Sequence, residues 1–252
     1  YRTGQKKLVS DVYRTIMRQK LLFMQAPTGV GKTISTIFPA VKAVGEELAD
    51  RIFYLTAKTI TATVAKETFA LLEKKGYRAK TIQITAKEKL CPCDEMECNP
   101  VTCPYAKGHF DRVNDAVFDL LHRCEMIERD DILSQADRYT VCPFELCLDT
   151  ASWCDNIICD YNYVFDPNVY LKRFFQEGIK GDYIFLIDEA HNMVERSRQM
   201  YSAQIYKEDF LTVKRIMKEH SRSIEKALEK CNKILLQLHF LHPALIFRAL
   251  KS

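Results

Sequence analysis

No apolar run in this sequence approaches the roughly 18–20 residues that a membrane-spanning helix needs. The first residues do not resemble a signal peptide either, so we expect an intracellular, cytoplasmic protein with no membrane partner. Internal repeats and low-complexity tracts are also absent, which excludes solenoid and fibrous classes. Because the chain begins at Tyr1 rather than at methionine, we expect it to be trimmed at the front.

The composition is that of an ordinary globular protein. With 252 residues, 47% apolar and 28% charged, the chain can bury a core in one large domain or two modest ones. The net charge of +4 is uneven, because residues 196–252 hold 12 Lys/Arg against 5 Asp/Glu, so this tail is +7 and the remainder −3. A basic tail is compatible with contact to a phosphate backbone, and equally with a solvated helical face.

Ten cysteines are many for a chain of this kind. A secreted disulfide framework is disfavoured by the chain's length, its apolar content and the lack of a signal peptide. In a reducing compartment, clustered cysteines more often hold metal than each other, so we expect a metal site.

Apolar runs alternate with helical stretches along most of the chain. Strands are predicted at 21–26, 51–56, 79–85, 156–160 and 183–187, with helices at 32–48, 60–75 and 167–177. Strands separated by helices of this length form a parallel sheet with right-handed crossovers. The predicted fold class is therefore α/β, a parallel sheet flanked by helices.

Two parts depart from this alternation. Residues 86–150 hold most of the cysteines, several prolines and helical segments near 111–127 and 130–137. We predict an insertion held by its cysteines, since little apolar sequence there could hold it otherwise. After Asn192 the chain is helical and charged, with one apolar stripe formed by Ile224, Leu228, Cys231, Leu235 and Leu238. The predicted domains are 1–85 with 151–192 (the α/β part), 86–150 (cysteine insertion) and 193–252 (helical).

The clearest chemical signal follows the first predicted strand and opens a helix; it consists of Ala26, Pro27, Thr28, Gly29, Val30, Gly31, Lys32 and Thr33. Gly29 and Gly31 allow backbone N–H groups to curl around a phosphate chain at the positive end of the helix. Lys32 would neutralise the β- and γ-phosphates of ATP, and the Thr33 hydroxyl would bind Mg²⁺. The strict P-loop pattern has glycine at the position of Ala26.

A second signal, Asp188-Glu189-Ala190-His191, directly follows the last predicted strand. A P-loop ATPase needs a carboxylate at such a strand end to hold Mg²⁺, which is the role predicted for Asp188. A second carboxylate, Glu189, would position and activate the attacking water. His191 completes the predicted catalytic set.

Four cysteines form the third signal: Cys91, Cys98, Cys103 and Cys142, spaced C-x6-C-x4-C-x38-C. Structural zinc sites usually bring tight C-x2-C or H-x3-H pairs, and this set has none. Four thiolates from loops with proline neighbours suit a [4Fe–4S] cluster. Cys93 is an alternative to Cys91 as a ligand.

The two nucleotide motifs resemble motifs I and II of superfamily 2 helicases, a resemblance that implies a RecA-like P-loop NTPase sheet. Thr56, Lys58 and Thr59, after the second strand, resemble motif Ia, where such families touch the nucleic-acid backbone, although Thr59 could simply cap a helix. Arg2-x-x-Gln5 resembles the adenine-reading element ahead of motif I, and could equally be a polar N-terminus.

The position of the insertion in the sequence points to one family among these helicases. With Lys89-Leu-Cys91 at its start and Cys142-Pro-Phe144 near its end, it closely resembles that of the XPD/DinG-like iron–sulfur helicases. The segment from Tyr161 to Pro167 resembles the one that follows the cluster there. The resemblance implies ATP hydrolysis, 5′ to 3′ translocation on single-stranded DNA, unwinding at duplex junctions and a role in DNA repair.

The same resemblance implies a helical arch, which residues 193–252 would begin. Nothing after Asn192 resembles motif III, and no second motor domain with an arginine finger follows. We therefore expect a fragment that ends inside the arch at Ser252 and is no motor by itself. Its missing partner would be the second motor domain of the same protein.

Several residues have only ordinary roles in this interpretation. We expect His109 and His122 to be surface polar groups without a partner, and Trp153 to pack against its neighbours. Two other functions stay open. One is an RNA-directed DEAH ATPase whose insertion binds zinc, and the other is a nucleotide-gated switch with a redox-sensing cluster.

Overall fold

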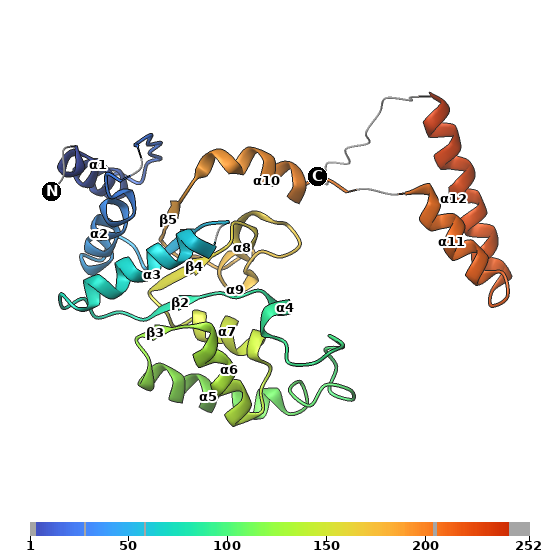
Figure 1. Cartoon of the computed structure of the whole chain (residues 1–252), viewed down its shortest axis with the longest axis horizontal. Helices are drawn as coiled ribbons and strands as arrows, with labels where there is room; N and C mark the ends of the chain where they lie inside the picture. The colour runs from blue at the N-terminus through green and yellow to red at the C-terminus, as the bar shows by residue number, and fades with distance from the viewer. Residues whose placement is uncertain (1–3, 28, 58, 204–205, 242–252) are drawn as a thin grey trace. The chain divides into compact units, whose positions relative to one another are not determined.

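The computed structural model describes residues 4–27, 29–57, 59–203 and 206–241. At its centre the strands form a five-stranded parallel sheet in the order β3-β2-β4-β1-β5 (Figure 1). They are β1 (Arg51–Leu55), β2 (Thr81–Gln83), β3 (Met126–Ile127), β4 (Asn156–Cys159) and β5 (Tyr183–Ile187). The predicted fold class, a parallel sheet flanked by helices, is confirmed.

The α-helices surround this sheet or follow it in the chain. They are α1 (Gln5–Met17), α2 (Lys32–Gly45), α3 (Thr59–Glu73), α4 (Lys87–Leu90), α5 (His109–Arg123), α6 (Arg129–Tyr139), α7 (Pro143–Ala151), α8 (Asn162–Phe165), α9 (Lys172–Phe175), α10 (Met193–Met200), α11 (Lys207–Met217) and α12 (Arg222–Leu241). The sequence analysis missed α1 and α7, and the helix that it predicted near 111–127 ends at Arg123, before β3. Pro143 is the first residue of α7, where its fixed φ suits a helix start, although the Cys-Pro pair had suggested a loop.

Both faces of the sheet are covered, as parallel sheets require. On one face, Ile52 and Tyr54 of β1 belong to a core shared with α2 and α3. On the other face, the Phe53 ring contacts Phe174 and Phe175 of α9, with ring centroids 5.3 and 5.2 Å apart. Successive side chains of β1 therefore pack against the helices on opposite faces of the sheet.

The predicted first strand, 21–26, is wrong. Leu21 and Phe23 are 88% and 87% exposed, and no strand of the described residues pairs with this segment. An apolar run becomes a strand only beside a partner that satisfies its backbone groups. The helix predicted at 167–177 is also shorter than expected, since only α9 forms there.

The cysteine insertion has a core of its own, which corrects the expectation that only its cysteines could hold it. Helices α5, α6 and α7 pack on one another. Their buried apolar side chains are Val113, Ala116, Val117, Leu120, Ile132, Ala136, Leu146 and Ala151. Only the stretch from Cys91 to Gly108, which carries three of the four predicted ligands, lacks helix and strand.

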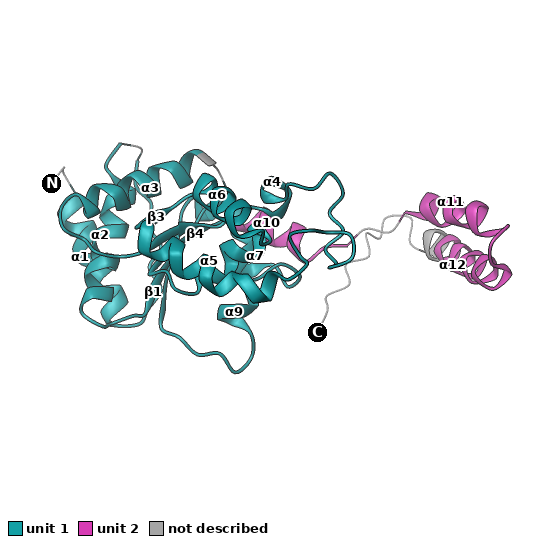
Figure 2. Ribbon diagram, turned by 90° about the horizontal axis from the view of Figure 1, so that it is seen from below, with its two compact units in different colours: residues 1–192 teal, residues 193–252 magenta. Residues whose placement is uncertain are grey.

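The chain divides into two compact units, Tyr1–Asn192 and Met193–Ser252, which Figure 2 colours separately. In the second unit α11 packs against α12, and Lys214 pairs with Glu229 at 3.6 Å. Leu228, Cys231 and Leu235 of the predicted stripe are half-buried, whereas Ile224 is exposed and the Leu238 side chain lies outside the described residues. None of the described helices is long and apolar enough to span a bilayer.

Candidate nucleotide site and cysteine loop

The loop that leads into α2 has the backbone of a phosphate-binding turn. Gly29 and Gly31 have φ values of +85° and +80°, a left-handed conformation that glycine adopts without strain. Gly31 is the N-cap of α2, so Lys32 and Thr33 form the first turn of that helix. A helix N-terminus presents unpaired N–H groups and a partial positive charge, both suited to phosphate. Thr28 lies outside the described residues.

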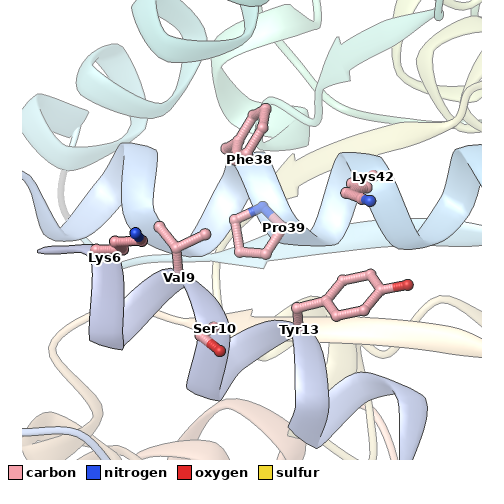
Figure 3. Close-up of a pocket in the computed structure, with 7 residues that line it drawn as sticks. All are labelled: Lys6, Val9, Ser10, Tyr13, Phe38, Pro39 and Lys42. Carbon is pink, nitrogen blue, oxygen red and sulfur yellow. The ribbon is translucent and has the colours of Figure 1, made fainter. Parts of the chain in front are cut away.

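Gln5 lies against this loop, and its role in reading adenine stays a prediction. A Cβ atom on Gly31 would come within 2.8 Å of Nε2, the movable end of the Gln5 side chain, so the φ angle is the stronger reason for glycine there. Gln5 also lines a hollow of about 250 Å³ with Val9 and Phe38. An adjoining hollow of similar volume between α1 and α2 is lined by Lys6, Val9, Ser10, Tyr13, Phe38, Pro39 and Lys42 (Figure 3).

The acidic motif comes directly after β5, beside the carboxyl end of β1. The Asp188 amide donates a hydrogen bond to the Leu55 carbonyl at 3.0 Å, which fixes the loop to that strand end. Lys32 Nζ lies 3.9 Å from Glu189 Oε1, so the two motifs meet although 157 positions separate them in the sequence. His191 Nδ1 lies 3.4 Å from Glu189 Oε2 on an exposed ring. The structure therefore brings Lys32, Glu189 and His191 together.

Two tyrosines that the sequence analysis did not single out support this loop. Tyr54 of β1 hydrogen-bonds to Asp188 and Thr33, the two predicted Mg²⁺ ligands, and burial followed by the Asp188 charge raises the pKa of Tyr54. The buried Tyr161 donates hydrogen bonds to the main-chain carbonyls of Asp188 and Glu189. Their signal in the sequence was position, because each lies at or just after the carboxyl end of a strand.

Glu189 itself has a φ of +49°, a left-handed conformation that costs free energy in a residue with a Cβ. The Asn192 amide donates to the Glu189 carbonyl at 2.9 Å, and the Glu189 amide donates to Asp188 Oδ1 at 3.1 Å. These bonds, with those from Tyr161, hold the strained residue in place.

The predicted nucleic-acid contacts receive less support from the structure. Thr56 is buried at the end of β1, and its hydroxyl hydrogen-bonds with that of Thr61. Lys58 and the Thr59 side chain lie outside the described residues, so their contact with nucleic acid stays a prediction. Trp153, expected to pack, is 70% exposed.

The cysteines of the insertion lie near one another without forming a closed ligand set. Cys91 ends α4, and Cys142 is the N-cap of α7. A hydrogen bond to Cys98, together with the Cys142 and Cys91 sulfurs, raises the pKa of Lys87, so three of the four predicted ligands lie close enough to influence one lysine. Among the described residues, no three His, Cys, Asp or Glu side chains are arranged to hold a metal ion.

Cys93, the alternative ligand, faces Cys103 with 4.0 Å between the sulfurs. Burial and the neighbouring Cys103 raise the pKa of Cys93 to about 11. Both Cys91 and Cys93 are thus close to another predicted ligand, and the choice between them stays open.

His109 corrects an expectation of the sequence analysis. It is 3% exposed rather than at the surface, and it has a partner, because its Nδ1 accepts a hydrogen bond from the Cys142 amide at 3.2 Å. His122 is exposed as expected, although its Nδ1 lies 2.8 Å from the Phe118 carbonyl oxygen.

A P-loop and an acidic loop that meet at the carboxyl edge of a parallel sheet define a P-loop nucleotide-binding protein. The DEAD_2 family model matches residues 62–210, more than half of the chain. The chain belongs to this family, among the XPD-like helicases of superfamily 2.

Two curated relatives agree with this assignment. The chain is 23% identical over 223 residues to the General transcription and DNA repair factor IIH helicase subunit XPD/RAD3 of Saccharomyces cerevisiae, an alignment that covers 75% of this chain and 28% of that protein. It is 28% identical over 76 residues to the Fanconi anemia group J protein homolog of Gallus gallus, covering 30% and 6% respectively. The chain therefore spans well under a third of the length of either relative.

Solved structures show the same fold. A structure titled XPD_Helicase has a TM-score of 0.59 at 17% identity and covers 93% of this chain and 40% of its own. Another, titled Truncated XPD, has the same TM-score and identity, with coverages of 92% and 65%.

Proposed function

We propose that this chain is the ATP-binding half of an ATP-driven DNA helicase. The observation that carries the proposal is the approach of Lys32 Nζ to Glu189 Oε1, 3.9 Å apart at the carboxyl edge of the sheet. The ammonium group of Lys32 and the carboxylate of Glu189 therefore face the same space. Phosphoryl transfer to water needs both groups there.

In this proposal, residues Ala26–Thr33 bind the phosphates of ATP, and Gln5 reads the adenine. Thr33 and Asp188, linked through Tyr54, are the Mg²⁺ ligands. Glu189 orients the attacking water and accepts its proton, with His191 beside it. Mg²⁺ supplies charge neutralisation between the β- and γ-phosphates when bound.

We propose that Cys91, Cys98, Cys103 and Cys142 hold a [4Fe–4S] cluster in the insertion, residues 86–150. These four cysteines fit a [4Fe–4S] cluster, because all four are free thiols. Three of them lie near Lys87, whose positive charge offsets the negative charge of thiolates. The cluster would fix the 91–108 stretch, which has no helix or strand of its own. In a motor of this class it would stand where the duplex splits.

The remaining assignments follow from family membership and from the basic tail. Residues 1–85 with 151–192 would form the first motor domain, and 193–252 the start of a helical arch. The intact protein would act inside the cell, in DNA repair, translocating 5′ to 3′ on single-stranded DNA towards duplex junctions. Lys58 and Thr59 would touch the DNA backbone, with Thr56 fixing their loop. Hydrolysis would need an arginine from a second motor domain.

Strand displacement tests this proposal most broadly. The intact protein, with ATP and Mg²⁺, should separate a duplex that carries a 5′ single-stranded tail, whereas the 252-residue chain should not. Robust unwinding by the 252-residue chain would show that the motor is complete without a second domain. Unwinding only from a 3′ tail would overturn the proposed polarity.

A further inference from the structure

The first turn of α5 contacts the segment that leads to Cys142. Arg112 donates hydrogen bonds from Nε to the Tyr139 carbonyl at 2.8 Å and from Nη2 to the Thr140 carbonyl at 2.6 Å. Three positions earlier, His109 accepts the Cys142 amide at 3.2 Å. Positions i and i+3 lie on the same face of a helix, so both side chains reach one stretch of backbone.

The same turn also contacts the end of the cysteine loop. Arg112 Nη2 donates to the Lys107 carbonyl at 2.8 Å, four residues after Cys103. The same guanidinium binds the carbonyl of Thr140. The φ of Thr140 is +51°, a strained backbone conformation that contacts with its surroundings must stabilise. One helical turn therefore joins the loop that carries Cys91, Cys98 and Cys103 to the backbone of Cys142.

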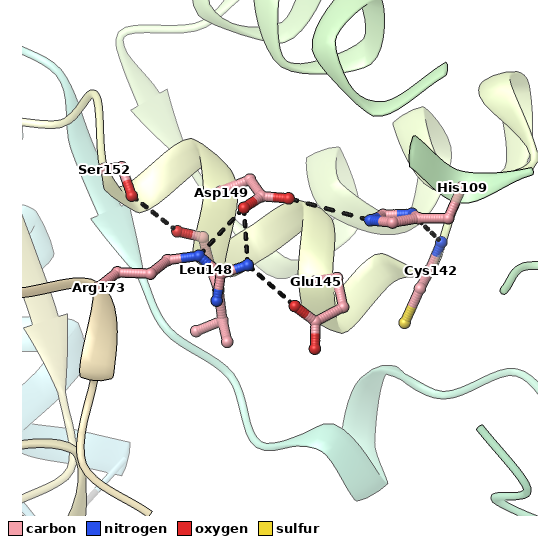
Figure 4. Close-up of polar contacts among 7 residues, drawn as sticks. All are labelled: His109, Cys142, Glu145, Leu148, Asp149, Ser152 and Arg173. Atoms are coloured by element: carbon pink, nitrogen blue, oxygen red, sulfur yellow. Dashed lines mark hydrogen bonds and ion pairs between the residues drawn. The ribbon is translucent and has the colours of Figure 1, made fainter. Parts of the chain in front are cut away.

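The hydrogen bond from Cys142 fixes the chemical form of His109. A ring nitrogen that accepts an N–H bond carries no proton, so Nδ1 is bare and the neutral ring has its proton on Nε2. Figure 4 shows the ring between the Cys142 amide on one side and Asp149 on the other.

Asp149 links His109 to other elements of the first unit. Its Oδ2 lies 3.9 Å from His109 Nε2, which has no hydrogen-bond partner among the described residues. Its Oδ1 accepts bonds from Arg173 Nε at 3.0 Å and Nη2 at 2.7 Å, and Arg173 also binds Glu145 at 2.9 Å (Figure 4). Arg173 belongs to α9, whose phenylalanines pack on β1, so the network runs from Cys142 to the nucleotide-binding sheet.

We propose that His109 and Arg112 are positioning residues that set the backbone of Cys142 against the cysteine loop, so that the fourth sulfur meets the other three. The inference rests on the proposed cluster. His109 acts by engaging the Cys142 amide through Nδ1. This bond prevents the Cys142 amide from donating a hydrogen bond to a sulfur of the cluster. Hydrogen bonds from N–H groups to sulfur are among the factors that set the reduction potential of a cluster.

Three substitutions separate the roles of the His109 ring. His109→Asn places an amide oxygen near the position of Nδ1 and keeps the acceptor for Cys142. His109→Gln places its amide near Nε2, facing Asp149, and leaves the Cys142 amide without a partner. His109→Leu removes both polar positions while filling the space.

The measurements are iron per intact protein after anaerobic reconstitution, the visible absorption spectrum and the midpoint reduction potential. We expect wild type and His109→Asn to hold full iron with matching spectra and potentials. His109→Leu and His109→Gln should lose about 10- to 100-fold in iron affinity, as loss of groups that orient ligands does, and shift the potential of any remaining cluster. Arg112→Lys should resemble them, because the three carbonyls are reached from two separate nitrogens of a planar guanidinium, a spread of donors that a single ammonium nitrogen does not have.

Each outcome decides one question. If wild type takes up no iron, the proposed cluster is wrong, whatever the variants do. If wild type is loaded and His109→Leu matches it in iron, spectrum and potential, the positioning role is wrong. Should His109→Leu fail to fold, the Asn and Gln variants decide: equal loss in both overturns the role of Nδ1, and retention in Asn alone supports it.

Discussion

Lys32 Nζ of the P-loop lies 3.9 Å from Glu189 Oε1 of the acidic motif, across the carboxyl edge of one parallel sheet. Each side chain is about one-third exposed, so the pair faces a space that solvent and a ligand can enter. A triphosphate placed between them would replace this ion pair by contacts to its own oxygens.

Replacing Lys32 by Ala should weaken ATP binding strongly. The lysine would contact charged oxygens, and such a hydrogen bond contributes about 1.5–3 kcal/mol, or roughly 10- to 100-fold in Kd. Calorimetric titration with Mg²⁺–ATP measures the change. Lys66 lies on α3 and pairs with Glu128, so Lys66→Ala is the matched control and should bind as wild type does. Unchanged affinity in Lys32→Ala would exclude the P-loop as the phosphate site.

Glu189→Gln should keep ATP binding and stop hydrolysis. The amide preserves the size and most contacts of the side chain but cannot accept a proton from water. Binding and steady-state ATPase activity of the intact protein separate the two effects. Equal loss of binding and hydrolysis would mean that Glu189 holds Mg²⁺, the role assigned to Asp188.

Tyr161→Phe should weaken the fold and slow hydrolysis together. The phenol supports the carbonyls of Asp188 and Glu189, and loss of such a bond costs about 0.5–1.5 kcal/mol of unfolding free energy. Denaturant unfolding and the ATPase kcat measure the two effects. Tyr170→Phe, the same exchange before α9, is the control. A normal kcat in Tyr161→Phe would show that the acidic loop holds its shape without the hydroxyl.

Serine at Cys91, Cys98, Cys103 or Cys142 should remove the visible absorption near roughly 400 nm and most of the bound iron. Cys124→Ser, at the end of α5, is the control within the same insertion. Circular dichroism should change little, because α5, α6 and α7 have their own apolar core. If Cys93→Ser loses the iron while Cys91→Ser retains it, Cys93 is the ligand. Zinc in a colourless wild-type protein would favour the RNA-directed alternative.

Lys58→Ala should weaken binding of single-stranded DNA to a similar degree for all sequences. A lysine on a phosphate adds about one unit to the slope of log affinity against log salt, so the slope should fall by about that amount. Fluorescence anisotropy at several salt concentrations gives the slope, with Lys66→Ala as control. An unchanged slope would remove Lys58 from the DNA contacts.

The sheet and the nucleotide motifs could be predicted because local patterns determine them. Strands such as Arg51–Leu55 and Tyr183–Ile187 are short apolar runs, and Gly31-Lys32-Thr33 needs no distant residue to be recognised. The segment 21–26 has the same apolar pattern, but a strand also requires a neighbour, which single-sequence periodicity does not reveal.

The supporting residues could not be predicted for a related reason. Tyr161 and His109 act through contacts with partners 27 and 33 positions away, and nothing local marks either contact. His109 in particular follows a glycine at the start of an amphipathic helix, a place where a polar side chain is ordinarily solvated. Only the folded insertion shows that the Cys142 amide lies beside His109.

The most direct test of an ATP-driven DNA motor is the ATPase rate of the intact protein with single-stranded DNA, with RNA of the same sequence, and with neither. We predict strong stimulation by DNA, little by RNA, and none in Glu189→Gln. Stimulation by RNA alone, or a rate indifferent to both nucleic acids, would contradict the proposed function.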